Sequence, residues 1–346
     1  MDTITQATLG AALGEAGWRK ALGPKAIAFG ALCGLIPDFD AVAALWGDWA
    51  SLEYHRSLTH SVLFAPVVSP ALGWIGWRWA KRRGTPRQWT KLAFWGLFTH
   101  PLLDVFTSYG TQLLYPFSKQ RFALDGVSII DPIYTFPLLI ALFVALLWRK
   151  RPEVGAWATR LTLGLTTLYL LFGWHLAGRA EAVGLSQAPS SLAPTFARAT
   201  PTFGNMALWR VILRGREGNL VVGYTSHIAP TDIKWHPVER AEDPAVITAL
   251  GHPHGQLFQW FSDGLLATRV TPEPGGTMVE LVDVRYGGVL KPAEGIWLVE
   301  VHLDNQGEVL STKMIRPEGR RMDIKAEFAA QWQMIWNGAA DTASTP

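Results

Sequence analysis

The sequence predicts an α-helical polytopic membrane bundle of four to five spanning or re-entrant helices, followed by a mostly β (α+β) soluble domain. Three observations lead to this fold class. Of the 346 residues, 49% are hydrophobic and only 17% are charged, whereas soluble proteins usually carry about 25% charged residues. Long apolar runs fill the first half of the chain. Short β-prone runs separated by turns fill the second half.

Five apolar runs define the expected membrane helices. A spanning helix needs about 20 mainly apolar residues, and the second, third and fifth runs approach that length. The fourth is a little short. The first contains Pro37 and two carboxylates, so it either spans or enters and returns. The runs cover residues 26–46, 61–80, 92–109, 132–148 and 157–178.

Basic residues in the connecting loops predict the orientation of the bundle. Lys and Arg are concentrated in 81–91 and in 149–151. Cytoplasmic loops are enriched in these residues, so both loops are expected in the cytoplasm, with 48–60 and 109–131 on the outer side. The chain is therefore expected to be a multi-pass protein of the bacterial inner (plasma) membrane. Its C-terminal domain is expected in the periplasm or another extracytoplasmic space.

Composition divides the chain into four parts. Residues 1–180 form the membrane-embedded helical domain, and 181–202 are rich in Pro, Ala and Ser, which is typical of a linker. We expect an extracytoplasmic, mostly β domain over 203–338 and a disordered tail over 339–346.

Within the β domain, turn residues separate the expected strands. The segment from Arg216 to Asn219 indicates a hairpin, and Asp323 is placed to cap a closing helix that runs to Trp336. The expected strands lie near 208–213, 220–225, 256–261, 265–270, 278–286 and 296–303.

Ionisable side chains gather in three segments at or near membrane depth. A carboxylate at the centre of a membrane helix costs about 2.5–3.5 kcal/mol on insertion scales. Such residues are therefore normally paired, bound to metal or in contact with a wet cavity. The segments contribute Asp38 and Asp40, then His55 and His60, and finally His100 and Asp104.

The spacing of these residues favours a metal site. His100 and Asp104 are four residues apart, so they share one face of a helix. His55 and His60, and likewise Asp38 and Asp40, converge only through irregular backbone. Imidazole and carboxylate donors together suit a divalent metal, zinc first and manganese or iron as alternatives. A metal with an open position supplies hydroxide for hydrolysis, and Asp38, Asp40 or Asp104 could instead act as the base.

Each group also has a structural interpretation. The His100 and Asp104 pair could be a hydrogen bond between helices, and His55 and His60 could be ordinary loop residues. Asp38 and Asp40 could mark a loop between two short helices. Taken together in a membrane protein, the six residues favour the metal site.

The same residues carry a family resemblance. The segments MDTITQATLGAALGEA, PDFD, HRSLTHS, HPLLDVFTSYGTQLLYPFS and DPIYTFPL resemble the membrane-bound metal-dependent hydrolases, also called LexA-binding, inner-membrane-associated hydrolases. The resemblance covers about residues 1–150. It implies a metal-site role for Asp38, Asp40, His55, His60, His100 and Asp104.

The resemblance also bears on chemistry and on one missing residue. The family is thought to be distantly similar to zinc-dependent phospholipases C, which favours phosphoester hydrolysis. Many relatives carry a histidine where this chain has Gln6, and Glu15 is a speculative substitute for it.

Two arginines lie just outside the expected site. Arg56 and Arg121 could hold a substrate phosphate, since guanidinium pairs well with phosphate. Contact with lipid headgroups at the interface is an equal alternative. His252 and His254, in a Pro- and Gly-containing segment, are expected to form an exposed turn rather than a ligand pair.

Three functions compete on the sequence alone. The first is an inner-membrane hydrolase that uses a metal-activated water on an ester or phosphoester of a lipid-like substrate. The second is a non-enzymatic scaffold or sensor whose outer β domain binds a protein partner. The third is an ion or proton pathway, which the apolar fourth and fifth runs disfavour. Membrane lipid is the expected partner, and no nucleic acid is expected.

Overall fold

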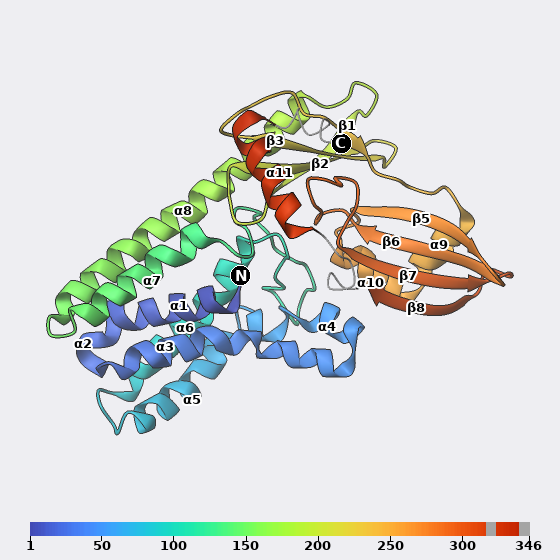
Figure 1. Cartoon of the computed structure of the whole chain (residues 1–346). Coiled ribbons are helices and arrows are strands. Elements are labelled where there is room, and N and C mark those ends of the chain that lie inside the picture. The colour runs from blue at the N-terminus through green and yellow to red at the C-terminus, as the bar shows by residue number, and fades with distance from the viewer. Residues whose placement is uncertain (316–322, 339–346) are drawn as a thin grey trace. The chain divides into compact units, whose positions relative to one another are not determined.

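The chain forms two compact units in the computed structural model, which describes residues 1–315 and 323–338. The first unit comprises Met1–Leu45, Tyr54–Leu176 and Phe203–Met206. The second comprises Trp46–Glu53, Ala177–Thr202 and the chain from Ala207 onward. Figure 1 shows helices in the N-terminal part of the chain and two sheets in the C-terminal part.

Helices occupy all five expected runs of the N-terminal part. Short irregular helices connect them, among them the π-helix η1 (Gly14–Trp18) and the 3-10 helices η2 (Ile36–Trp46) and η3 (Leu58–His60). The α-helices are α1 (Thr3–Leu13), α2 (Arg19–Leu22), α3 (Lys25–Leu35), α4 (Asp48–Tyr54), α5 (Phe64–Trp79), α6 (Pro86–Val105), α7 (Pro132–Leu147) and α8 (Pro152–Ser186).

Within the described residues, two helical segments are long and apolar enough to cross a membrane. They are Lys25–Trp46, formed by α3 and η2, and α8. A third span results if Asp48–His60 and Phe64–Trp79, which are bent by 68°, are counted as one. Helix α7 is apolar but has only 16 residues, about 24 Å of rise against a hydrocarbon core of about 30 Å.

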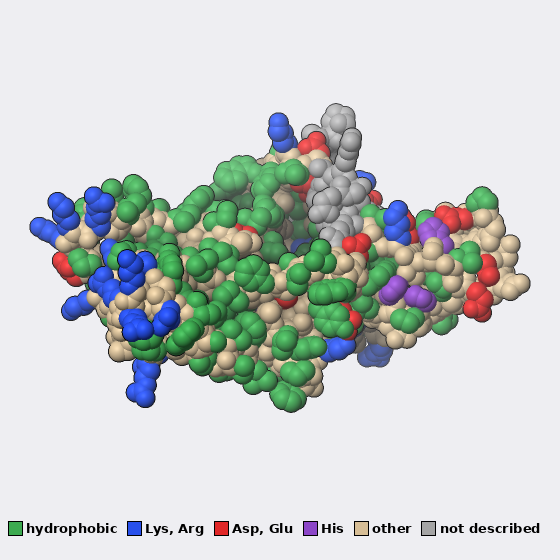
Figure 2. Space-filling view, turned by 90° about the horizontal axis from the view of Figure 1, so that it is seen from below, with side chains coloured by type: hydrophobic (Ala, Val, Ile, Leu, Met, Phe, Trp, Pro, Cys, Tyr) green, Lys and Arg blue, Asp and Glu red, His purple; other side chains and the backbone are tan. Residues whose placement is uncertain are grey.

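The two basic loops lie at the same end of the helical unit. Figure 1 places the α5–α6 and α7–α8 connections together, at the end of the unit marked by α2. In Figure 2, Lys and Arg side chains gather at that end, and hydrophobic side chains cover much of the surface beside them. The Lys and Arg residues of the two loops, far apart in the sequence, are therefore gathered at one end of the helical unit.

Glycines hold α1 and α3 in close contact. A Cβ built on Gly10 would lie 2.1 Å from the carbonyl oxygen of Gly30, and one on Gly30 would lie 2.2 Å from that of Gly10. One turn away, a Cβ on Gly14 would meet the carbonyl of Ala26 at 2.3 Å, and one on Gly34 that of Gln6 at 2.5 Å. Small residues four apart allow the two backbones to touch, as in other membrane helix pairs.

Helix η2 gives its side chains a period of three. Pro37 follows the first residue of the segment, where regular α-helix becomes unfavourable. Side chains at i and i+3 eclipse in a 3-10 helix, and Phe39, Val42 and Leu45 are all exposed. Asp40 and Ala43, one residue further on, are shielded. The aspartates of this segment therefore lie on columns separate from the apolar outer one.

The second unit contains two four-stranded antiparallel sheets. Their strand orders are β1-β2-β3-β4 and β5-β6-β7-β8, each following the chain. The strands are β1 (Pro194–Pro201), β2 (Leu208–Gly215), β3 (Leu220–Ser226), β4 (His236–Pro237), β5 (Leu266–Glu273), β6 (Gly276–Asp283), β7 (Trp297–Asp304) and β8 (Val309–Ile315). Helices α9 (Pro244–Gly251), α10 (Pro253–Phe261) and α11 (Ile324–Asn337) complete the unit.

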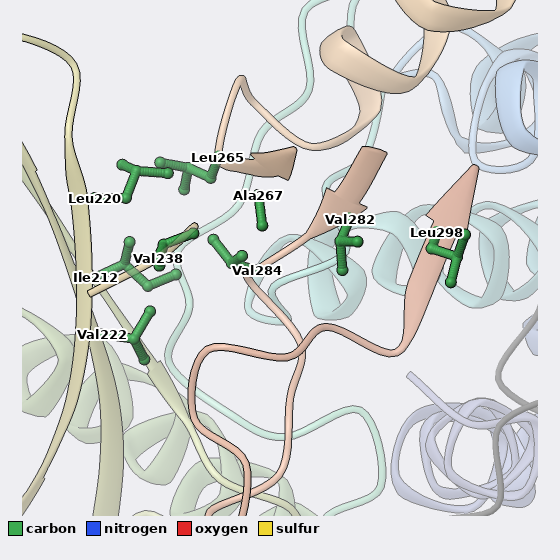
Figure 3. Packing of buried hydrophobic residues seen from close by; sticks show 9 residues of the cluster. All are labelled: Ile212, Leu220, Val222, Val238, Leu265, Ala267, Val282, Val284 and Leu298. Atoms are coloured by element: carbon green, nitrogen blue, oxygen red, sulfur yellow. The ribbon is translucent and has the colours of Figure 1, made fainter. Parts of the chain in front are cut away.

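One apolar core joins the two sheets. Ile212 and Val222 from the first sheet pack with Val282 and Leu298 from the second. Figure 3 shows these side chains among the nine that form the cluster. Because alternate residues of a strand face opposite sides, each sheet contributes one apolar face to the shared interior.

Several expected elements of this unit are confirmed. The hairpin around residues 216–219 connects β2 to β3, and the strands expected near 265–270, 278–286 and 296–303 are β5, β6 and β7. The closing helix is α11, and the Asp323 carboxylate caps it by accepting the backbone N–H groups of Lys325 and Ala326.

Other expectations for this unit are wrong. Residues 256–261 were expected as a strand, yet they belong to α10. Its first residue, Pro253, suits the start of a helix, and the side chain of His252 caps it by accepting from the His254 N–H. Residues 181–202, expected as a linker, hold the end of α8 and strand β1. The tail expected over 339–346 lies outside the described residues.

Candidate metal centre

The six predicted side chains come from three parts of the helical unit. Asp38 and Asp40 are on η2, His55 and His60 lie after α4 and on η3, and His100 and Asp104 are on α6. The irregular backbone expected for the first two pairs is present as the two 3-10 helices. His100 and Asp104 lie four apart on one regular helix, and both are fully buried.

Three of the side chains surround one point. Asp38, His60 and His100 each offer one ligand atom, and these atoms all lie within 4.8 Å of one another. The two histidine Nε2 atoms are 3.1 Å apart. Asp38 Oδ1 lies 3.7 Å from His60 Nε2 and 3.3 Å from His100 Nε2. Donor atoms of a tetrahedral zinc site are about 3.4 Å apart, since zinc bonds to N and O are about 2.1 Å long.

Asp104 faces the same two nitrogens. Its Oδ2 lies 3.3 Å from His60 Nε2 and 3.7 Å from His100 Nε2. Two donors bond to Oδ1 of the carboxylate, Gln6 Nε2 at 3.0 Å and the amino group of Met1 at 2.5 Å. The charged Arg56 Nε lies 3.1 Å from Oδ2 and forms an ion pair with it. Asp104 can therefore serve as a further ligand or as the buried charge that balances its cationic neighbours.

Hydrogen bonds from behind fix how the two imidazoles face the centre. His60 Nδ1 is hydrogen-bonded to the Thr59 hydroxyl at 3.1 Å and lies 3.0 Å from Asp40 Oδ2, to which that hydroxyl donates. His100 Nδ1 lies 2.6 Å from the carbonyl oxygen of Gly34. Carboxylates and carbonyls only accept, so each Nδ1 carries the proton and donates it. With Nδ1 engaged in this way, each ring directs its Nε2 at the centre, where it could coordinate a metal. Such outer partners are a regular feature of histidine ligands to metals.

Asp40 and His55 lie beside the three-residue group rather than within it. Asp40 Oδ1 pairs with His55 Nδ1 at 2.8 Å. Asp40 Oδ2 accepts hydrogen bonds from the Arg56 backbone N–H at 2.8 Å and from the Thr59 hydroxyl at 2.9 Å. This geometry favours Asp40 as the group that orients His60, with His55 further out and 28% exposed.

The two predicted arginines flank one aromatic ring. The Arg56 guanidinium lies 4.8 Å from the centre of the Tyr109 ring, and that of Arg121 lies 5.3 Å from it. Arg56 is buried and donates from Nη1 to Thr107 at 3.0 Å. Its φ of 61° is left-handed, which is uncommon for a side-chain-bearing residue. The turn therefore directs this arginine into the interior.

Access to the centre is from the side of Asp38. Its side chain is 24% exposed, while those of His60 and His100 are fully buried. Backbone bonds hold the loop after α6 against the His55–His60 segment: Gln112 N–H donates to Arg56 O, and Val62 N–H donates to Leu113 O. Exposed apolar side chains occur on η2, on η3 and in the loop after α6. They include Phe39, Leu58, Leu114 and Phe117.

Two contributors to the centre were not predicted as site residues. The Gly34 carbonyl is a backbone group, so its role cannot be predicted from the type of residue. Gln6 is buried with its Oε1 lacking a hydrogen-bond partner among the described residues, and its Nε2 bonds both Asp104 and the His100 carbonyl. The family resemblance, which implies a histidine at this position, was the available signal. Glu15 instead pairs with Arg19 at 3.3 Å.

Two curated bacterial proteins are similar to part of this chain. The chain is 32% identical over 182 residues to the uncharacterized protein YfhP of Bacillus subtilis, covering 49% of this chain and 53% of YfhP. It is 34% identical over 122 residues to the inner membrane protein YbcI of Escherichia coli, covering 34% of this chain and 69% of YbcI. The chain thus spans about half of YfhP. No solved structure matches it significantly.

The family model described as YdjM inner membrane protein matches residues 1–180. That range contains all six predicted ligands and ends within α8. The resemblance on the early motifs is thereby confirmed, and the chain belongs to the YdjM inner membrane protein family.

Proposed function

We propose that this protein is a metal-dependent hydrolase of the inner membrane that cleaves an ester or phosphoester of a lipid-like substrate. One observation carries the proposal. Two buried imidazoles, each with its Nδ1 proton held from behind, bring their Nε2 atoms to 3.1 Å. Nitrogens at that distance can share one proton or bind one cation, and the Asp38 carboxylate beside both supplies a third donor for a cation.

Zinc suits the donors, with manganese or iron as alternatives. Asp38, His60 and His100 would hold the ion, and Asp104 is close enough to join them. Two nitrogens and one or two carboxylate oxygens form a donor set typical of catalytic zinc sites. When bound, such a metal polarises the scissile group and lowers the pKa of a water.

Residues around the centre have further roles in the proposed reaction. Asp38 is the carboxylate of the centre with the most access to solvent, so we assign it the outer coordination position or the role of general base. Asp40 keeps His60 oriented. Arg56 and Arg121, on the Tyr109 ring, are placed to bind a phosphate near the centre.

The surroundings of the entrance favour a lipid-like substrate. Exposed Phe39 adjoins Asp38 in the chain, and exposed Leu58 lies on the same short helix as His60. A water-soluble substrate does not require apolar side chains at the entrance, whereas an acyl chain gains about 0.8 kcal/mol for each methylene it buries.

We also propose the topology that the basic loops favour. With 81–91 and 149–151 in the cytoplasm, four to five helices span or re-enter the membrane. The centre then opens toward the outer leaflet, and the C-terminal domain is periplasmic. Cysteine labelling from each side of the cell tests this arrangement at residues 119 and 84, which should react from opposite sides.

Metal analysis and hydrolysis assays test the function together. Purified wild-type protein should retain zinc or another divalent metal and release product from a phospholipid in mixed micelles, and chelator should stop the reaction. A His100→Ala variant should lose metal and activity. Protein that binds no divalent metal, or activity that survives both chelation and His100→Ala, would contradict the proposal.

Replacing Arg121 should separate substrate binding from metal binding. We expect Arg121→Gln to raise KM for a phosphoester about tenfold, the loss of one charge-assisted hydrogen bond of about 1.5 kcal/mol, with unchanged metal content. Steady-state kinetics and metal analysis on the same preparation check this. An unchanged KM would remove Arg121 from the substrate site.

A non-enzymatic scaffold or sensor is the second candidate. It is favoured by the C-terminal part of the chain, which after residue 180 lies beyond the family match and has its own apolar core. In that case the C-terminal unit binds a protein partner, and folded His100→Ala protein keeps its cellular function.

A further inference from the structure

Helix α11 is apolar on two opposite faces. Its inner face, with Ala330, Met334 and Ile335, packs on Leu208 and Tyr224 of the first sheet. The helix is further anchored at its first turn, where the buried Glu327 carboxylate accepts the backbone N–H groups of Val289 and Leu290 at 2.7 Å and 3.3 Å. The side facing the sheet is thus fully explained by the fold of the unit.

The outer face carries large apolar side chains at every fourth residue. Ile324, Trp332 and Trp336 are 65%, 64% and 51% exposed, and Phe328 stands between them in the same row. The rings of Trp332 and Trp336 lie 5.5 Å apart. A surface helix normally has polar residues on the side away from the core, so this row indicates a second contact.

We propose that the outer row of α11 binds the surface of the lipid bilayer to which the chain is anchored. Ile324 and the two tryptophans enter the boundary between headgroups and acyl chains, with the helix parallel to the membrane plane. Tryptophan is enriched at that boundary because its ring is apolar and its N–H is polar. Amphipathic helices that lie in this boundary bury aromatic and aliphatic residues in the same way.

The connection to α8, a candidate membrane span, tethers the second unit within a short reach of the bilayer. Arg179 and Glu181 end the apolar part of α8, and the helix continues to Ser186, about 10 Å beyond Arg179 at 1.5 Å per residue. Seven residues, 187–193, then lead to β1, a reach of at most about 25 Å. The second unit is therefore confined close to a membrane surface, which raises the local concentration of lipid.

Site-specific fluorescence on the full-length protein tests the proposal. The single native cysteine, Cys33, is replaced by alanine, and cysteine is introduced as Trp332→Cys or Ile324→Cys and labelled with an environment-sensitive dye. The matched control is Ile247→Cys on α9, which is 75% exposed in the same unit but off the row. Each protein is placed in phosphatidylcholine nanodiscs with or without nitroxide-labelled lipid.

We expect the nitroxide lipid to quench the dye at 332 and 324 at least twofold more than at 247. Equal quenching at all three positions, or none at 332 and 324, would overturn the proposal. A blue-shifted dye that nitroxide lipid does not quench would also overturn it, because a protein would then cover the row. Two labelling positions guard against one substitution that fails to fold. The outcome is independent of the metal centre.

Discussion

Replacing His60 with alanine should abolish metal binding by the purified protein. His60 is fully buried, its Nε2 is shared with His100, Asp38 and Asp104, and its Nδ1 is held by Asp40. Losing it removes one of the two nitrogen donors and leaves the surrounding carboxylates without their imidazole partner. We expect the affinity for zinc to fall by well over 100-fold, measured by competition with a chelating dye in detergent.

Two further variants make this result specific. Asp40→Asn keeps the shape of the residue behind His60 but weakens its hold on Nδ1, so affinity should fall only about 10- to 100-fold, as is usual for such outer partners. His175→Ala, on α8 and outside the candidate group, should bind metal like wild type. If His60→Ala retains wild-type affinity, the centre is not where the structure places it.

A side chain at Gly30 should destabilise the helical unit strongly. Gly30→Val puts a Cβ 2.2 Å from the Gly10 carbonyl oxygen, which is backbone and cannot move aside cheaply. Overpacking of this kind costs about 1–3 kcal/mol or more, because α1 and α3 must separate. We expect the midpoint of thermal unfolding in detergent to fall by about 5 °C or more, or the protein to aggregate on purification.

Gly164 on α8 is the matched control for this substitution. A Cβ there meets nothing within 4 Å, so Gly164→Val should unfold close to the wild-type temperature. The same separation would disturb the centre, since Gln6 on α1 and the Gly34 carbonyl on α3 both contact it. Equal stability of the two variants would show that the glycine contact does not hold the helices together.

The sequence predicted which three segments meet at the candidate centre, but not how each side chain lies within it. His and Asp residues within the apolar runs could be selected as candidates, because each carries a large desolvation cost at membrane depth. Spacing then paired His100 with Asp104. It could not separate Asp38, which faces the centre, from Asp40, which stands behind His60. That difference depends on the turn of η2, and two residues in a 3-10 helix point about 120° apart.

In the second unit, local composition predicted the wrong secondary structure in two segments, because tertiary contacts determine the structure there. The run from Gln256 to Phe261 has aromatic residues that favour strands, yet His252 and Pro253 start a helix just before it. Strand β1 was not predicted, because the Pro, Ala and Ser content of residues 181–202 is typical of a linker. Pro194 and Pro201 stand at its two ends, where a missing N–H costs an edge strand little.

The threefold period of η2 limits how this part of the chain can change in length. Adding one residue between Pro37 and Trp46 would turn everything after it by about 120°, and apolar side chains would exchange places with shielded ones. Adding three would restore the phase and only push the next helix along its axis, by about 6 Å. Insertions and deletions that survive selection in this helix should therefore come in steps of three residues.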